Sequence, residues 1–163
     1  MEPKRTQWYI GTPNGVVICL NGFQNRTFHG VLYHSYAEEG TPFENAEQMV
    51  LAMEKLYNWL NFPHPGTNER SFAEQPNTRE RMTERKKIMS DDSLLKRHGD
   101  LGSFVVRVQH RQNSSWQGRI TWMEEDKTLY FRSVWEMIKL IESAVDASSA
   151  PEDEEEKEAS WFD

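Results

Sequence analysis

The sequence predicts an α+β protein built from two copies of a strand-strand-helix (ββα) unit. The copies form a mostly antiparallel sheet with two helices packed on one face, and a disordered acidic C-terminal tail follows. Three observations predict this: residues 15–56 align without a gap with residues 103–144, both segments pass from a two-residue to a helical periodicity, and acids gather in 151–163.

The repeat is clearest in QNRTFHG (24–30) and QNSSWQG (112–118), which lie 88 positions apart. Identities and conservative pairs continue at the same offset along both segments. Agreement without gaps indicates duplication of one supersecondary unit.

Each copy begins with a predicted β-hairpin. The segments that begin with Gln-Asn are predicted to be the polar turns of the hairpins. Apolar residues alternate along the strands that precede these turns: Val16, Ile18 and Leu20 in the first copy, Phe104, Val106 and Val108 in the second. Gly30 and Gly118 follow in the returning strands, where we expect them to leave room for a helix.

Each copy ends in a predicted amphipathic helix. Asn45 with Gln48, and Ser133 with Glu136, have the spacing of a capping box at matching positions. Apolar residues then recur at helical spacing. A unit of roughly 45 residues is too small to bury a stable core alone, so we expect the copies to pack about a pseudo-twofold axis in a sheet of at least four strands.

These elements divide the chain into four parts. Residues 1–60 are the first repeat with an extra N-terminal strand, 61–102 a linker with a basic surface helix over 78–89, and 103–146 the second repeat. The acidic tail, 147–163, is predicted to be disordered.

Charge and composition narrow the class of protein. The net charge is −7, and residues 151–163 contribute −6 of it, so the remainder of the chain is nearly neutral. MEPKRTQWYIG lacks the apolar core of a secretory signal, and no apolar run approaches the ~18 residues of a membrane span. We expect a cytoplasmic protein without a membrane partner.

Catalysis is not predicted. The single cysteine, Cys19, has no neighbouring base to lower its pKa, and one cysteine supports neither a disulfide nor a multi-cysteine metal site. The histidines lack ligand spacing, and no phosphate-binding loop or nucleophile elbow is present. We therefore expect no enzyme, no metal and no cofactor.

The outward face of the second hairpin is the first candidate binding surface. Its guanidinium and amide groups could bind phosphates, carboxylates or single-stranded bases. Sequence alternation shows no aromatic residue on this face for a base to stack on. The candidate residues are Arg107, Gln109, Arg111, Gln117, Arg119 and Thr121.

The matching face of the first hairpin is apolar, with Val17, Cys19, Val31 and Tyr33. Two alternatives stay open: residues 61–102 cover this face, or it serves self-association, as in a homodimer, or docking of a partner. The tail is the third candidate surface, because Trp161 and Phe162 follow its acids and could anchor a basic partner. The alternative is that the tail folds back on Arg107 and Arg119 of the same chain as an internal competitor.

Residues 103–145, SFVVRVQHRQNSSWQGRITWMEEDKTLYFRSVWEMIKLIESAV, resemble a group of short uncharacterised proteins from anaerobic Firmicutes bacteria. The resemblance covers about a quarter of the chain. It implies a bacterial or phage setting and transfers no functional residues.

The leading hypothesis is a non-catalytic protein that binds another macromolecule and regulates or inhibits a bacterial or phage-defence system. An anti-CRISPR-like protein that docks on a basic nucleic-acid-binding enzyme is one form of it. The alternative is a nucleic-acid-binding module that uses the basic face of the second hairpin and the basic residues of 79–97.

Overall fold

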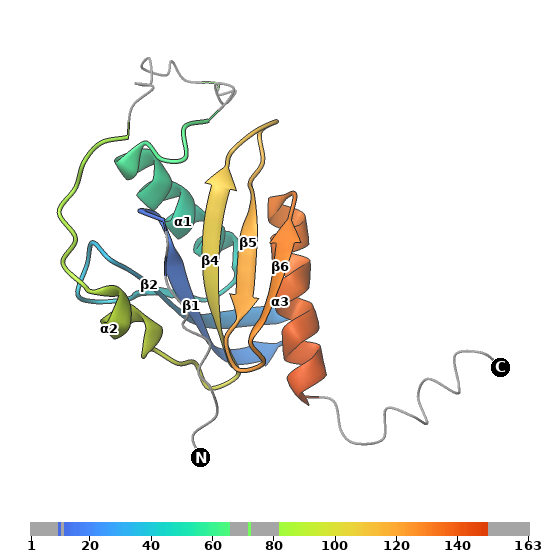
Figure 1. Cartoon of the computed structure of the whole chain (residues 1–163). Coiled ribbons are helices and arrows are strands. Elements are labelled where there is room, and N and C mark those ends of the chain that lie inside the picture. The colour runs from blue at the N-terminus through green and yellow to red at the C-terminus, as the bar shows by residue number, and fades with distance from the viewer. Residues whose placement is uncertain (1–9, 11, 66–71, 73–81, 150–163) are drawn as a thin grey trace.

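The computed structural model describes residues 10, 12–65, 72 and 82–149. Its centre is one antiparallel sheet of six strands in the order β3-β2-β1-β4-β5-β6 (Figure 1). The strands are β1 (Val16–Gln24), β2 (Thr27–His34), β3 (Thr41–Phe43), β4 (Gly102–His110), β5 (Gln117–Trp122) and β6 (Lys127–Phe131). The α+β class and the mainly antiparallel sheet are as predicted.

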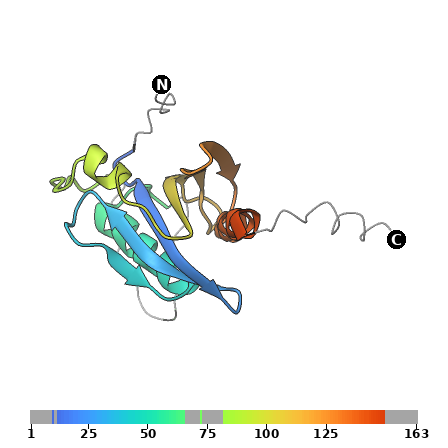
Figure 2. The ribbon, with the colours of Figure 1, turned by 90° about the horizontal axis from the view of Figure 1, so that it is seen from below.

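Three helices pack on the two faces of this sheet. α1 (Ala46–Leu60) and α3 (Val134–Ser149) bury their apolar stripes against one face and form the main core. The short helix α2 (Asp91–Leu95) lies on the opposite face (Figure 2), where Leu94 belongs to a second, smaller core cluster. We call the α2 side the outer face of the sheet.

The two halves of the chain contain the same elements in the same order: three strands and then a long helix. The third strand of each half, β3 or β6, is not among the predicted elements. Both are edge strands, and only the last residue of each is buried. A strand with so little buried surface lacks the alternation by which strands are recognised.

The halves meet in the middle of the sheet, where β1 pairs with β4. Val17 lies opposite Val105, and these positions are 88 residues apart. On either side of this pair, Val16 lies opposite Val106 and Ile18 opposite Phe104. The pairing is therefore symmetric about Val17 and Val105, and one continuous sheet runs through both halves.

The repeated Gln-Asn phrases are turns, as predicted. Asn25 and Arg26 have φ values of 53° and 60°, and Asn113 and Ser114 have 54° and 58°. Positive φ at two successive residues matches the right-handed twist of the strands that a hairpin joins. A bulge also interrupts each first strand at matching positions, between Leu20 and Gly22 in β1 and between Val108 and His110 in β4.

Gly30 and Gly118 do not make room for a helix, and that expectation was wrong. A Cβ atom on Gly30 would collide with the carbonyl oxygen of Cys19 in the neighbouring strand, and one on Gly118 with that of Arg107. Both glycines instead permit close approach of two strands, which is a usual role for glycine in a sheet.

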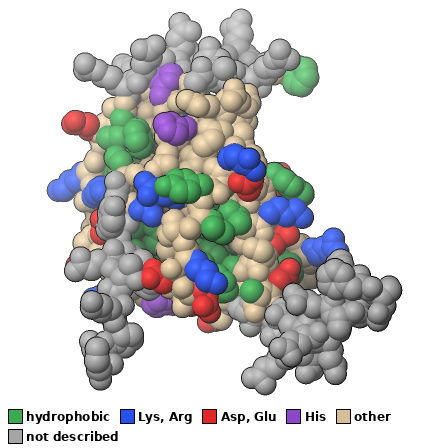
Figure 3. Space-filling view, turned by 45° about the vertical axis from the view of Figure 1, so that its right-hand side comes forward, with side chains coloured by type: hydrophobic (Ala, Val, Ile, Leu, Met, Phe, Trp, Pro, Cys, Tyr) green, Lys and Arg blue, Asp and Glu red, His purple; other side chains and the backbone are tan. Residues whose placement is uncertain are grey.

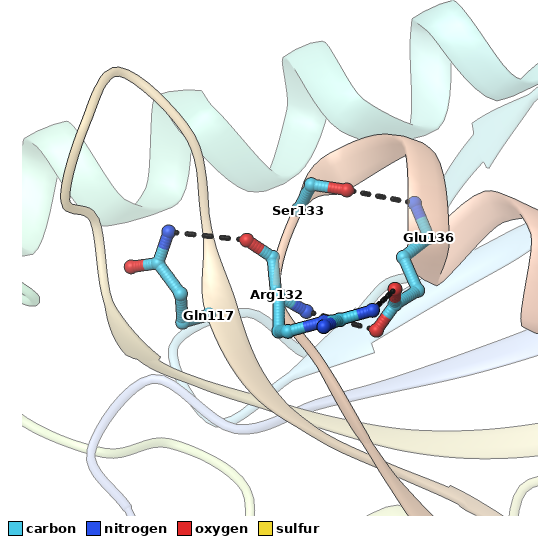
Figure 4. Close-up of polar contacts among 4 residues, drawn as sticks. All are labelled: Gln117, Arg132, Ser133 and Glu136. Atoms are coloured by element: carbon cyan, nitrogen blue, oxygen red, sulfur yellow. Dashed lines mark hydrogen bonds and ion pairs between the residues drawn. The ribbon is translucent and has the colours of Figure 1, made fainter.

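The two predicted helix starts are confirmed. Asn45 Oδ1 accepts a hydrogen bond from the amide of Gln48 at 2.8 Å, and Ser133 Oγ accepts one from the amide of Glu136 at 3.0 Å (Figure 4). In return, the Glu136 side chain accepts a bond from the amide of Arg132 at 3.2 Å. These reciprocal bonds satisfy amides that the first turn of a helix leaves free.

The basic surface helix predicted over 78–89 is wrong in its described part, because 82–89 form no helix. The amides of this segment donate to other elements instead: Thr83 to Leu60 O at 2.7 Å, and Ile88 and Met89 to Ser35 O at 2.6 and 2.9 Å. Tertiary hydrogen bonds here replace those of a helix, and α2 begins only at Asp91.

Two other predicted segments are partly outside the described residues. Of the extra N-terminal strand only Ile10 is described, and it is buried in the second cluster without being part of a strand. The predicted tail began at Ala147, but α3 continues to Ser149, which corrects that boundary. Residues 150–163 lie outside the described part.

Candidate docking surface on the outer sheet face

The outer face of the first half is covered. Val17 and Cys19 are buried in the second cluster together with Leu94 of α2 and Val105 of β4. Of the two alternatives for this face, burial by residues 61–102 therefore holds for Val17 and Cys19, and their assignment to a self-association surface is wrong.

The other two residues of that predicted surface, Val31 and Tyr33, are partly buried on β2. The Arg97 guanidinium lies over the Tyr33 ring, 4.9 Å from its centroid. Arg97 follows α2 in the chain, so the linker contacts this part of the first hairpin as well.

Cys19 is an unreactive thiol in this setting. Burial, with the nearby negative charge of Glu124 adding to it, raises the pKa of Cys19 to about 11, although Arg97 acts in the opposite direction. The reactive thiolate is therefore scarce at neutral pH. This agrees with the structural role that the sequence predicted for Cys19.

The outer face of the second half carries a polar network across three strands. We call this surface the Arg-Tyr face; it consists of Arg107, Gln109, Arg119, Thr121, Thr128 and Tyr130. Arg107 lies opposite Arg119, which lies opposite Tyr130. Three successive strands thus bring two guanidinium groups and one phenol ring to a single row.

Contacts within the Arg-Tyr face hold its side chains in place. Arg107 Nη2 donates to Thr121 Oγ1 at 3.4 Å, and that hydroxyl lies 2.8 Å from the hydroxyl of Thr128. The Gln109 side-chain amide is oriented so that its oxygen faces the Arg119 guanidinium. That oxygen accepts from Arg119 Nη2 at 3.0 Å and from Nε at 3.2 Å. The Arg119 guanidinium also lies 5.5 Å from the centroid of the Tyr130 ring.

Tyr130 is the functional candidate that sequence reasoning missed. Its side chain is 68% exposed, although it belongs to a strand. The sequence was interpreted as having no aromatic residue on this face because β6 was not recognised. Recognising Thr128 and Tyr130 as alternate residues of a third strand would have placed both beside Thr121 and Arg119.

Further exposed hydrophobic side chains lie beside this surface, at the β6 edge and on the helix side of the sheet. Leu129 is 54% exposed on β6, and Trp135 is 67% exposed at the start of α3. Figure 3 shows this side of the molecule, where green hydrophobic and blue basic side chains lie next to one another. Such mixed surfaces are typical of protein-binding sites.

Two of the predicted binding residues are buried, so neither presents its side chain to a partner. Arg111 is only 5% exposed: its Nε donates to Pro63 O, at 2.6 Å, and its Nη1 to Asn58 Oδ1, at 2.7 Å. Thr121 is 4% exposed, and its hydroxyl connects Arg107 with Thr128 within the network. Arg111 is therefore a structural residue, and its assignment to a partner site was wrong.

Gln117 also has an internal role. Its amide nitrogen donates to Arg132 O at 3.3 Å (Figure 4) and to Gln112 O at 3.0 Å, while its oxygen accepts from the amide of Gln112 at 3.0 Å. The side chain thus connects the hairpin turn to the residue before the α3 cap. Trp161 and Phe162, the remaining predicted binding residues, lie outside the described part.

Metal and membrane sites are not found in the part of the chain that the structure describes. Among residues 10, 12–65, 72 and 82–149, no three His, Cys, Asp or Glu side chains gather in a way that could hold a metal ion. None of the helices there has the length and apolar character that a membrane crossing needs.

Comparison with protein-family models, with curated proteins and with solved structures finds no match to this chain. Its function therefore has to be argued from the geometry of the surfaces described above.

Proposed function

We propose that this protein is a non-catalytic binding protein that docks on another macromolecule through the Arg-Tyr face. The observation that carries the proposal is the contrast between the halves. In the first half α2 covers the outer face, whereas in the second half Tyr130 is largely exposed beside a buttressed Arg119. Groups held in place before binding lose less conformational freedom when a partner binds.

We infer that the two halves are copies of one unit. The inference is supported by the turns, bulges, close-approach glycines and helix caps, all of which recur 88 residues apart. The outer face is where the halves differ most: Cys19 corresponds to Arg107, Val31 to Arg119 and Pro42 to Tyr130. The outer face of the first copy then contributes to the stability of the fold, and the outer face of the second copy is accessible to a binding partner.

A protein partner suits this surface best. Guanidinium groups bind carboxylates in a fixed planar geometry, and an exposed tyrosine beside them adds apolar contact area at low entropic cost. The acidic segment 151–163 would steer the encounter with a basic region of the same partner. The proposed role is that of a cytoplasmic regulator or inhibitor of a bacterial or phage-defence system.

Affinity copurification from the native host, read by mass spectrometry, tests this proposal. Arg119→Glu and Tyr130→Ala in the full chain should each reduce recovery of a specific partner at least tenfold. Lys55→Glu is the matched control, because Lys55 is an exposed cation on α1, in the layer behind the first half of the sheet. Equal recovery by all three variants would contradict docking through the Arg-Tyr face.

Nucleic-acid binding is the second candidate, and Tyr130 is the observation that favours it. A ring next to Arg119 can stack on a base while the guanidinium groups contact phosphates. Single-stranded RNA and DNA should then bind with an affinity that falls steeply with salt. Arg107→Ala/Arg119→Ala should lower the slope of log K against log salt by about 1.4, if two phosphate contacts are lost. No binding at low salt excludes this candidate.

A further inference from the structure

Each half of the molecule has a pocket between its sheet and its long helix. The first has a volume of about 370 Å³ and is lined by His34, Tyr36, Thr41, Ala52, Lys55, Leu56 and Trp59. The second, which we call the α3 pocket, has a volume of about 210 Å³ and is lined by Phe104, Ile120, Trp122, Lys127, Leu129, Leu140, Ser143, Ala144 and Ala147. Six lining positions correspond at the 88-residue offset, from His34 and Trp122 to Trp59 and Ala147.

The two pockets are filled differently. In the first, Trp59 packs against Tyr36 in an edge-to-face arrangement with ring centroids 5.5 Å apart. In the α3 pocket the corresponding positions are Ala147 and Glu124, so neither ring is present. An apolar cavity of roughly 150 Å³ is known to accept benzene, so the α3 pocket has room for one aromatic ring.

Two residues of the described segment 82–89 contact the end of α1. The Arg85 guanidinium lies 4.3 Å from the centroid of the Trp59 ring and donates to Trp59 O at 3.3 Å. Thr83, two residues earlier, donates to Leu60 O at 2.7 Å. In the first half, therefore, the described segment that includes Thr83 and Arg85 packs against the end of α1 and on the Trp59 ring.

The chain that follows α3 has the length and the aromatic residues to place a ring in the α3 pocket. Trp161 comes 14 residues after Ala147, which lines the pocket. Trp161 comes 12 residues after Ser149, the last residue of α3, and 12 extended residues span up to about 40 Å, whereas the whole of α3 is only about 24 Å long. The length of the chain is therefore sufficient for Trp161 and Phe162 to reach the α3 pocket, and a site on the same chain raises their effective concentration there.

We propose that Trp161-Phe162 docks in the α3 pocket of the same chain and supplies the ring that Ala147 lacks. Lys127, in the pocket lining, is a cation that suits the acidic residues 152–156, which precede the aromatic pair in the sequence. The turn residues Glu124, Glu125 and Asp126 repel the same acids, so the anchor is the aromatic pair and not the charge. This inference does not depend on docking of a partner at the Arg-Tyr face.

Methyl NMR of the full-length protein tests the proposal. In Trp161→Ala/Phe162→Ala, the methyl groups of Ala144, Ala147 and Leu140 should lose the ring-current shifts that a docked aromatic ring causes. The methyl group of Ala52, which occupies the position of Leu140 in the first pocket, is the internal control and should not move. Ser160→Ala is the matched variant, because it alters the same segment and keeps both rings.

Unchanged shifts at Ala144 and Ala147 in the double variant would overturn the proposal, whether the pocket is then empty or reserved for a ring from another protein. Shifts that appear only at high protein concentration would assign the ring to a second copy and also overturn docking within the chain. As an independent test, Ala147→Trp should fill the pocket and release residues 161–162, seen as a fall in their heteronuclear NOE. The alanine variants decide the question even if Ala147→Trp does not fold.

Discussion

Arg111 is the residue whose role differs most from its prediction. Alternation from Arg107 and Gln109 places it on the outer face, yet it donates to Asn58 and Pro63 on the opposite side, beside α1. The bulge between Val108 and His110 explains the difference. An extra residue in a strand redirects the side chains beyond it, so the alternation that holds for Arg107 fails for Arg111.

We predict that Arg111→Ala lowers the free energy of unfolding by about 2–4 kcal/mol, because buried hydrogen bonds from a charged donor are lost and a cavity remains. Arg132→Ala is the control, since Arg132 is exposed and its guanidinium pairs with Glu136 at the surface. Urea denaturation followed by circular dichroism measures both. A loss for Arg111→Ala no larger than that for Arg132→Ala would contradict the structural role.

At the scale of elements, the close approach of strands at Gly30 and Gly118 leads to a second prediction. Gly30→Ala and Gly118→Ala should each lower the free energy of unfolding by roughly 1–3 kcal/mol or prevent folding, because the added methyl group meets backbone that cannot move aside. At Gly102 the nearest atom to an added Cβ lies 3.5 Å away, in ordinary contact. Gly102→Ala should therefore be tolerated, and thermal unfolding of the three variants compares them directly.

Elements with strong local signals were predictable from sequence. Both long helices begin at their predicted caps, and the central strands alternate as expected, because these features depend on residues close together in the chain. The edge strands β3 and β6 were missed because most of their side chains are exposed. The helix over 78–89 was wrong because hydrogen bonds to Leu60 and Ser35, distant in sequence, decide the conformation there.

At the scale of the whole molecule, one core extends across both halves. The main cluster contains residues of α1 and α3 and of strands on both sides of the central β1–β4 pair. Polar contacts cross the same boundary: Asn14 Nδ2 donates to Val108 O at 2.8 Å, and Arg111 to Asn58. Neither half has a core of its own.

We therefore predict a single cooperative unfolding transition. Backbone amides of β2 and β5, which lie in different halves, should exchange with solvent at the same global free energy. Native-state hydrogen exchange at increasing denaturant measures this. A separate, less stable opening of either half would show that the β1–β4 pair does not couple them.

The Arg-Tyr face illustrates what sequence reasoning could find and what it could not. Alternation along β4 and β5 placed Arg107, Gln109 and Arg119 on one surface correctly. That Val17 and Cys19 are covered while Tyr130 is exposed depends on where α2 packs and on a third strand at the edge. Both depend on contacts between residues far apart in the chain, which a periodic pattern does not encode.

The edge-to-face contact between Tyr57 and Trp116 gives the molecule a built-in optical reporter. The rings belong to different halves, with centroids 5.3 Å apart. At that separation light absorbed by the phenol is emitted by the indole, and the tyrosine itself stays dark. Separation of the halves would restore emission from Tyr57 without any added dye, and the difference from a Tyr57→Phe variant isolates that signal from the other four tyrosines.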